Sequence, residues 1–80
     1  MMITQQRQLF KILELPKHLQ TTIAALLKLG AATATDVSKV TGKARAVESA
    51  YLNQFVTMRI AFKERIGRKV FFIINMEALK

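Results

Sequence analysis

The sequence predicts an α+β domain that is mostly helical, with a three-helix core, an additional N-terminal helix and a C-terminal β-hairpin. Apolar residues recur at helical spacing up to about residue 58. The period then changes towards alternation and ends in the β-branched and aromatic run Val70–Ile74. The three glycines, Gly30, Gly42 and Gly67, each fall at a boundary between such segments, where a turn is needed.

Length and composition indicate one small domain spanning residues 1–80. The chain has no cysteine, which excludes a disulfide framework and a thiolate metal site and fits a reducing cytoplasm. No apolar run approaches the ~18–20 residues of a membrane span, and the N-terminus lacks the pattern of a signal peptide. We therefore expect a soluble cytoplasmic protein with no membrane partner.

The charge is strongly basic, with 13 Lys and Arg against 5 Asp and Glu and a net charge of +8. Residues 43–69 carry seven of the basic residues and two of the acidic ones, so the excess is concentrated. A concentrated basic excess favours a polyanion-binding face over a surface that lysines merely keep soluble.

Two helices are expected before Gly30. Residues 1–15 place Ile3, Leu9, Phe10, Ile12 and Leu13 roughly on one stripe, and Pro16 then bends the chain. Residues 16–29 form the second helix, in which Leu19, Ile23, Leu26 and Leu27 recur at i, i+4, i+7 and i+8. Gly30 ends it as a left-handed cap.

A short helix is expected at residues 33–41, after the link Ala31-Ala32. Thr33 and Asp36 have the spacing of a capping box, with Thr35 as an alternative N-cap. Val37 and Val40 are expected to face inward, and Thr41-Gly42 ends the helix.

The longest helix is expected at residues 43–58. Its core stripe is predicted to contain Val47, Tyr51, Phe55 and Met58, widened by Leu52. The opposite face carries Arg45, Ala46, Ser49 and Asn53. Strands at about 60–65 and 69–75 follow, joined by a turn that contains Gly67, and the tail is either a helical turn or disordered.

Catalysis has few residues available. The five carboxylates form no spaced acid/base pair, His18 is the only histidine, and there is no Gly-rich phosphate loop. We therefore predict that the chain is not an enzyme and needs no cofactor or metal.

Nucleic-acid binding has more support. A helix that enters the major groove of DNA needs small residues for close approach and a few long donors, and residues 43–53 provide both. Four basic residues then cluster at the predicted turn, where they suit the phosphate backbone or the minor groove. The same features could belong to a solvated helix face and to an edge strand protected by lysines. The predicted binding residues are Lys43, Arg45, Ala46, Ser49, Asn53, Lys63, Arg65, Arg68 and Lys69.

The order of these elements over residues 16–75 resembles the winged helix-turn-helix family, in particular ArsR- and MarR-like repressors and short archaeal or archaeal-virus regulators. TATDVSKVTG resembles the second helix of that fold, KARAVESAYLNQF its recognition helix and KERIGRKVFF its wing. Two positions depart from the pattern: Met58-Arg59-Ile60 stands where a glycine is common, and Glu48 where an apolar residue is common. They leave the helix register open by one residue.

The resemblance implies a homodimer that binds double-stranded DNA, with the N-terminal helix as the expected dimer surface. The alternative is that the apolar residues of this helix pack onto their own domain. We expect the protein to be associated with the nucleoid. The family's metal-binding cysteines are absent, so metal sensing is not implied. Three functions stay open: a sequence-specific transcriptional regulator, a DNA-organising or repeat-array-binding protein of the same fold, and a winged-helix protein-interaction module.

Overall fold

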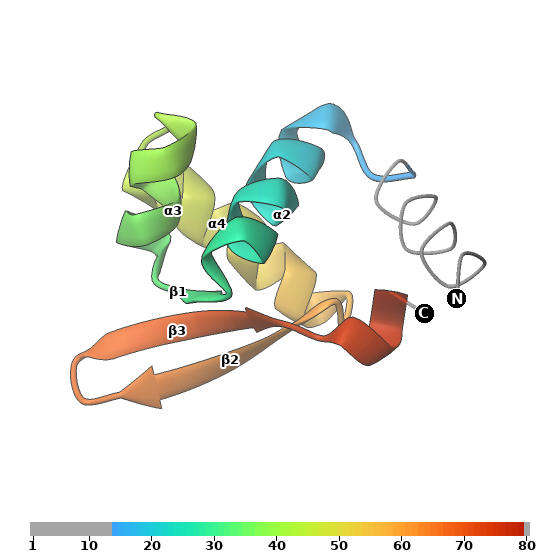
Figure 1. Ribbon diagram of the computed structural model, residues 1–80. Coiled ribbons are helices and arrows are strands. Elements are labelled where there is room, and N and C mark those ends of the chain that lie inside the picture. The colour runs from blue at the N-terminus through green and yellow to red at the C-terminus, as the bar shows by residue number, and fades with distance from the viewer. Residues whose placement is uncertain (1–13, 80) are drawn as a thin grey trace.

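The computed structural model describes residues 14–79, in which three helices pack on one side of a small antiparallel sheet (Figure 1). The helix predicted at residues 1–15 falls almost entirely outside this range. The helices are α2 (Lys17–Leu29), α3 (Ala34–Thr41) and α4 (Arg45–Thr57), and the strands are β1 (Ala31–Ala32), β2 (Ala61–Ile66) and β3 (Lys69–Ile74). A 3₁₀ helix, η1 (Met76–Leu79), follows the sheet. The predicted α+β class is confirmed, and so is the predicted order of the elements from α2 to β3, apart from the unexpected strand β1.

The sheet has the order β1-β3-β2, and both pairings are antiparallel. Gly67 and Arg68 form the two-residue turn between β2 and β3, and only Gly67 has a positive φ, of 63°. A positive φ confined to the first turn residue is the pattern of a type II′ hairpin turn, which requires glycine there. The turn projects beyond the helices at the left of Figure 1.

Strand β1 was expected to be a simple link. Two alanines carry no strand signal of their own, because alanine is depleted in strands. Ala31 and Ala32 form a strand because they lie beside Ile73 and Phe72 of β3 and complete that strand's backbone pairing. The link prediction was therefore wrong, and β1 ties the start of α3 to the sheet.

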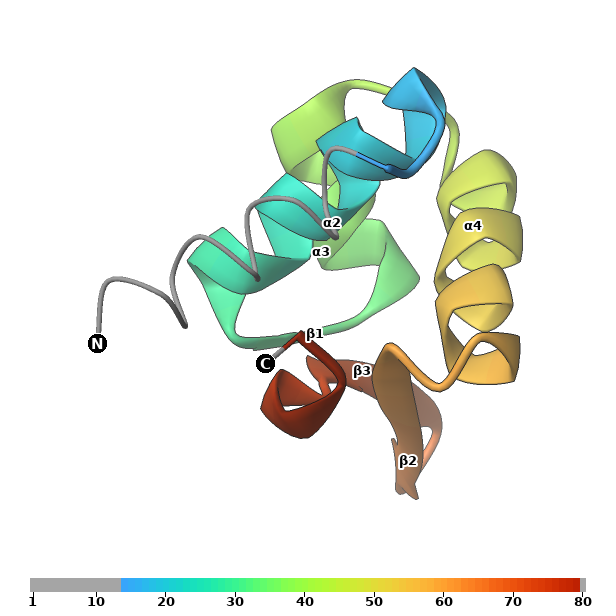
Figure 2. The ribbon, with the colours of Figure 1, turned by 90° about the vertical axis from the view of Figure 1, so that its right-hand side faces the viewer.

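The core lies between the helices and the inner face of the sheet. Its largest fully buried apolar side chains are Ile23 and Leu26 of α2 and Leu52 and Phe55 of α4. In β3, burial alternates, so Phe72 and Ile74 face the helices while Phe71 and Ile73 are half-buried on the outer face. Figure 2 shows α4 along one side of the helical layer and β2 and β3 below it.

Three residues on the predicted apolar stripes do not face the core as expected. Leu27 and Val40 are 38% and 46% exposed, and Val47 is 38% exposed. The side chains that each helix buries instead are Ile23 and Leu26 in α2, Val37 in α3, and Leu52 and Phe55 in α4. In this small domain, the buried face of each helix is narrower than the apolar stripe of its sequence.

Candidate nucleic-acid interface

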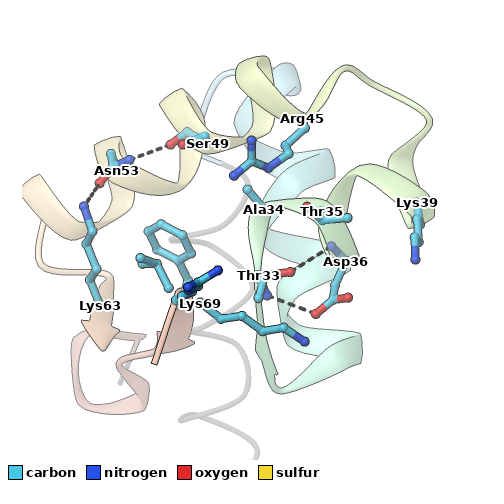
Figure 3. Close-up of a pocket in the computed structure, with 13 residues that line it drawn as sticks. Thr33, Ala34, Thr35, Asp36, Lys39, Arg45, Ser49, Asn53, Lys63 and Lys69 are labelled. Carbon is cyan, nitrogen blue, oxygen red and sulfur yellow. Dashed lines mark hydrogen bonds between the residues drawn. The ribbon is translucent and has the colours of Figure 1, made fainter. Parts of the chain in front are cut away.

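Six of the nine predicted binding residues line one groove, with a volume of about 390 Å³ (Figure 3). Helix α4 forms one wall, the β2–β3 hairpin a second and the start of α3 a third. The six predicted residues that meet there are Arg45, Ser49, Asn53, Lys63, Arg68 and Lys69.

The α4 wall presents Arg45, Ser49 and Asn53, which are spaced at i, i+4 and i+8 and therefore share one helix face. Both polar groups of the Asn53 amide are already engaged. Its Nδ2 donates to the Ser49 carbonyl at 2.9 Å, and its Oδ1 accepts from Lys63 Nζ at 2.9 Å. Each of these bonds uses one of the two donor hydrogens of Nδ2 or one of the two lone pairs of Oδ1, so the amide is oriented by them and keeps one donor and one acceptor site for a base or a phosphate.

The hairpin wall carries the positive charge of the wing. The Lys63 ammonium lies 6.0 Å from the Phe72 ring centroid as well as on Asn53, so one side chain connects the hairpin to α4. Arg68 and Lys69 reach the groove from the turn end of the hairpin.

The start of α3 forms the third wall. Thr33 is the N-cap, and the capping box is complete: Asp36 N–H donates to Thr33 Oγ1, and Thr33 N–H donates to Asp36 Oδ2, both at 3.1 Å. The backbone hydrogen bond from Thr33 is the largest cause of a lowered pKa for Asp36. The Thr33 side chain and the charges of Lys39 and Lys69 also lower this pKa.

The balance of charge in the groove is five cations against one carboxylate. Lys39, Arg45, Lys63, Arg68 and Lys69 face Asp36 alone among the lining residues. Because the Asp36 carboxylate is held by the cap, the groove as a whole attracts an anion.

Three predicted residues lie outside this groove. Lys43 Nζ stands 5.4 Å from the Tyr51 ring centroid, and Tyr51 in turn lies 4.9 Å from the His18 ring, on the side of α4 that meets α2. Ala46 is exposed on α4, and Arg65 Nε donates to the Gly67 carbonyl at 3.2 Å across the hairpin turn. Their roles in binding stay predictions.

The register of α4 differs from the predicted one, and Glu48 is the reason. The buried stripe is Glu48, Leu52 and Phe55, all 0% exposed, whereas Met58 is 47% exposed and Tyr51 is half-buried. Glu48 Oε1 accepts from the Thr22 hydroxyl at 2.9 Å, and Oε2 accepts from the Thr41 hydroxyl at 3.0 Å. One carboxyl group thus joins α2, α3 and α4.

The turn between α3 and α4 is held by further side-chain hydrogen bonds. Thr41 Oγ1 accepts from the Lys43 N–H at 3.2 Å, and the Ser38 hydroxyl donates to the Lys43 carbonyl at 2.6 Å. These bonds fix the start of α4, and so they set the direction in which Arg45 and Ser49 face.

Sequence reasoning missed the α3 wall of the groove. Thr33 and Asp36 were identified as caps, and Thr35 and Lys39 were given no binding role. The start of α3 reaches the groove because β1 pairs with β3 and brings Thr33 beside the wing. The sequence Ala31-Ala32 does not predict that pairing, because two alanines carry no strand pattern.

A relative of this chain occurs in an archaeon. An uncharacterized protein of Archaeoglobus fulgidus is 45% identical over 62 residues, a match that covers 78% of this chain and 84% of the relative. The chain belongs to the same family as this archaeal protein. No family model matches the sequence.

The architecture also has a counterpart among solved structures. The AntR antimony-specific transcriptional repressor superposes with a TM-score of 0.67 over 89% of this chain, at 24% identity. The match spans 63% of the AntR chain. With three helices and a three-stranded antiparallel sheet in this arrangement, the fold is a winged helix, in which α3 and α4 form the helix-turn-helix and β2–β3 the wing.

Among residues 14–79, no group of three or more His, Cys, Asp or Glu residues is placed to hold a metal ion. No helix in the same range has the length and apolar character needed to cross a membrane.

Proposed function

We propose that the chain binds double-stranded DNA as a sequence-specific transcriptional regulator, with α4 in the major groove and the wing on the phosphate backbone or in the minor groove. The observation that carries this proposal is the groove itself. It combines a helix face bearing Arg45, Ser49 and Asn53 with the basic hairpin residues Lys63, Arg68 and Lys69. The archaeal relative is uncharacterized and adds no function, while the fold of a solved repressor is consistent with the proposal.

The groove residues divide into two kinds of contact. Arg45 and Ser49 are assigned to base edges, because they face outward from the first half of the helix that would enter the groove. Arg68 and Lys69 are assigned to phosphates, because they lie at the projecting turn and are positively charged. Contacts of this kind position a protein on the duplex and do not read its sequence. Asn53 is assigned to positioning Lys63 and to contacting an adenine or a phosphate through the donor and acceptor sites that its two hydrogen bonds leave over.

The remaining parts of the proposal concern assembly. Residues 16–75 are proposed as the DNA-binding core of a single domain, and the protein is proposed to act as a homodimer on two half-sites of one duplex. A cytoplasmic, nucleoid-associated protein that binds rather than catalyses fits the basic excess of +8.

The proposal is tested by selecting bound duplexes from a random DNA pool at two salt concentrations, using the 80-residue chain. A sequence-specific regulator enriches one motif, and its affinity falls as salt rises. A DNA-organising protein retains DNA without enriching a motif. A protein-interaction module retains none at moderate salt, and that result would refute DNA binding.

Three variants separate the assigned roles. Arg45→Ala is expected to relax the preference at one base pair by about 1–3 kcal/mol. Arg68→Ala is expected to weaken binding to every sequence and to reduce the salt slope by about one. Lys28→Ala is the matched control, because it removes the same charge from the last turn of α2, outside the groove. If Arg68→Ala behaves like Lys28→Ala, the wing has been assigned wrongly.

A further inference from the structure

Lys63 connects the wing to helix α4 inside the groove. Side chains alternate along β2, so Ala61, Lys63 and Arg65 share the face of the sheet that is turned towards the helices. Ala61 is buried in the core, whereas Lys63 is exposed and is the first residue on that face to leave the core. From this position its ammonium group donates to Asn53 Oδ1 at 2.9 Å.

The two neighbours of the Asn53 amide determine which end of it points where. The Ser49 carbonyl can only accept a hydrogen bond, and it accepts one from Asn53 Nδ2 at 2.9 Å. The Lys63 ammonium can only donate, and its partner is Oδ1. Exchanging the two ends of the amide would set oxygen against oxygen and nitrogen against nitrogen. Figure 3 shows the two bonds in line, from Lys63 through Asn53 to Ser49.

The Lys63 side chain is itself held by Phe72. The two residues pair across β2 and β3, and the ammonium lies 6.0 Å from the centroid of the Phe72 ring. Phe72 is 2% exposed, so its ring is a fixed surface against which the long lysine side chain can lie. This contact lowers the entropy that Lys63 loses when it binds Asn53.

We propose that Lys63 is a specificity-determining residue of the wing, because it fixes the orientation in which the Asn53 amide meets a base. The inference rests on the proposed entry of α4 into the major groove. Adenine presents an acceptor, N7, beside a donor, the N6 amino group, on its major-groove edge. An amide whose two ends cannot exchange matches these groups for adenine on one strand and mismatches them for adenine on the other. Lys63 therefore acts as a positioning residue for Asn53.

A bound phosphate does not have to remove Lys63 from Asn53. The ammonium group has three donor hydrogens and Asn53 uses one of them, so two stay for phosphate oxygens. In the free protein Lys63 is exposed, and water competes for its bond to Asn53. Docked DNA excludes this water, and the bond should become stronger when the base is read. Lys63 can thus hold the backbone and orient the amide in the same complex.

The competing interpretation is that Lys63 contributes only its charge. Lys69 provides the matched comparison, because it is also an exposed lysine of the wing that lines the groove. It pairs with Ile66 beside the turn, whereas Lys63 pairs with Phe72 and is bonded to α4. Lys63→Met and Lys69→Met therefore remove the same charge from one groove, and only Lys63→Met removes the partner of the Asn53 amide.

Selection of bound duplexes separates the two interpretations. Asn53→Ala is expected to lower the preference at one base pair about tenfold, and Lys63→Met is expected to lower it at the same base pair about threefold or more. Lys69→Met should weaken binding to every sequence and leave that preference unchanged. In the Asn53→Ala background, Lys63→Met should cause no further loss of preference, because both residues act through one contact. A Lys63→Met variant that keeps the preference, as Lys69→Met does, overturns the inference.

NMR of the free protein provides a second measurement that needs no DNA. Because Lys63 is exposed, Lys63→Met should fold like the wild type. It should shift the Nδ2 proton signals of Asn53 and lower the order parameter of this amide, while Lys69→Met changes neither. Unchanged Asn53 signals in Lys63→Met overturn the inference even if the chain binds DNA selectively. A chain that binds no DNA, although Lys63→Met frees the amide, refutes the proposed function and the reading role with it.

Discussion

The two ends of helix α4 are fixed in contrasting ways. At the α3–α4 junction, side chains make the connections: Glu48 accepts from Thr22 and Thr41, and Ser38 donates to the Lys43 carbonyl. At the α4–β2 junction, backbone hydrogen bonds close the helix end, and one side chain, Asn75, adds a bond from Nδ2 to the Arg59 carbonyl at 3.1 Å. Ile60 N–H donates to the Phe55 carbonyl and Arg59 N–H to the Val56 carbonyl, which is the Schellman pattern.

The first junction depends on buried side-chain hydrogen bonds, whereas the second contains a strained backbone conformation. The first junction lies in the core and directs the proposed base-reading residues, so it depends on residue identity. The second requires a left-handed residue, and Arg59 adopts φ 64° there although glycine is the residue that does so without cost. Glu48 and Arg59 both depart from the winged-helix pattern, but Glu48 is expected to stabilise the folded chain and Arg59 to destabilise it.

The largest effect is expected from Glu48→Ala. The substitution removes the buried acceptor shared by the Thr22 and Thr41 hydroxyls, leaves Thr22 with only the His18 carbonyl at 3.2 Å, and creates a cavity, so the unfolding free energy should fall by about 2–4 kcal/mol. Urea unfolding measures this change. Glu48→Gln is the control, because an amide keeps the shape and an acceptor, and it should cost about 1 kcal/mol or less. An unaffected Glu48→Ala variant would mean that the network does not hold the junction.

A smaller loss is expected from Thr33→Ala at the start of α3. The variant removes the N-cap hydroxyl that accepts from the Asp36 N–H, and such caps contribute about 1 kcal/mol. Thermal unfolding of Thr33→Ala and Thr33→Ser should differ, because serine retains the cap. If both variants lose the same stability, the cap is not the cause.

At the second junction the expected change has the opposite sign. Arg59→Gly relieves the left-handed backbone but adds freedom to the unfolded chain, for a net gain of about 0.5–1 kcal/mol. Arg59→Ala keeps the strain and should change stability by less than about 0.5 kcal/mol. Urea denaturation curves of the two variants measure these changes in unfolding free energy. If both variants are more stable than the wild type, the effect comes from the arginine side chain and not from the backbone.

The smallest effect is the pH dependence of the cap. The folded pKa of Asp36 is lowered, mainly by the Thr33 backbone hydrogen bond, so its contribution is complete above the ordinary carboxyl pKa. The contribution is lost as pH falls through the lower, folded pKa. An Asp36→Asn variant should therefore show a shallower loss of stability below about pH 4 than the wild type. NMR titration of the Asp36 carboxyl carbon measures the pKa itself, and a midpoint at or above the ordinary value would contradict the prediction.

Much of the fold followed from local signals in the sequence. Pro16, the Thr33–Asp36 box and Gly67 each fix backbone geometry within a few residues, and the elements they bound formed close to the expected positions. Strand β1 did not follow, because Ala31 and Ala32 are extended only through pairing with a strand forty residues later. The burial of Glu48 did not follow either, since its two hydroxyl partners come from other helices.

The candidate site, too, was predicted in part from local sequence signals and decided in part by the tertiary structure. The sequence by itself determined which residues are basic, that they concentrate in residues 43–69, and that a helix and a hairpin carry them. Only the tertiary structure decided that Arg45, Ser49 and Arg68 share a groove while Lys43 lies over Tyr51 on the far flank of α4. Composition and local propensity act over a few residues, whereas the direction of a side chain in space depends on how whole helices pack. In this chain the apolar core packs the helices together, and the buried carboxyl group of Glu48 joins all three of them by hydrogen bonds to Thr22 and Thr41.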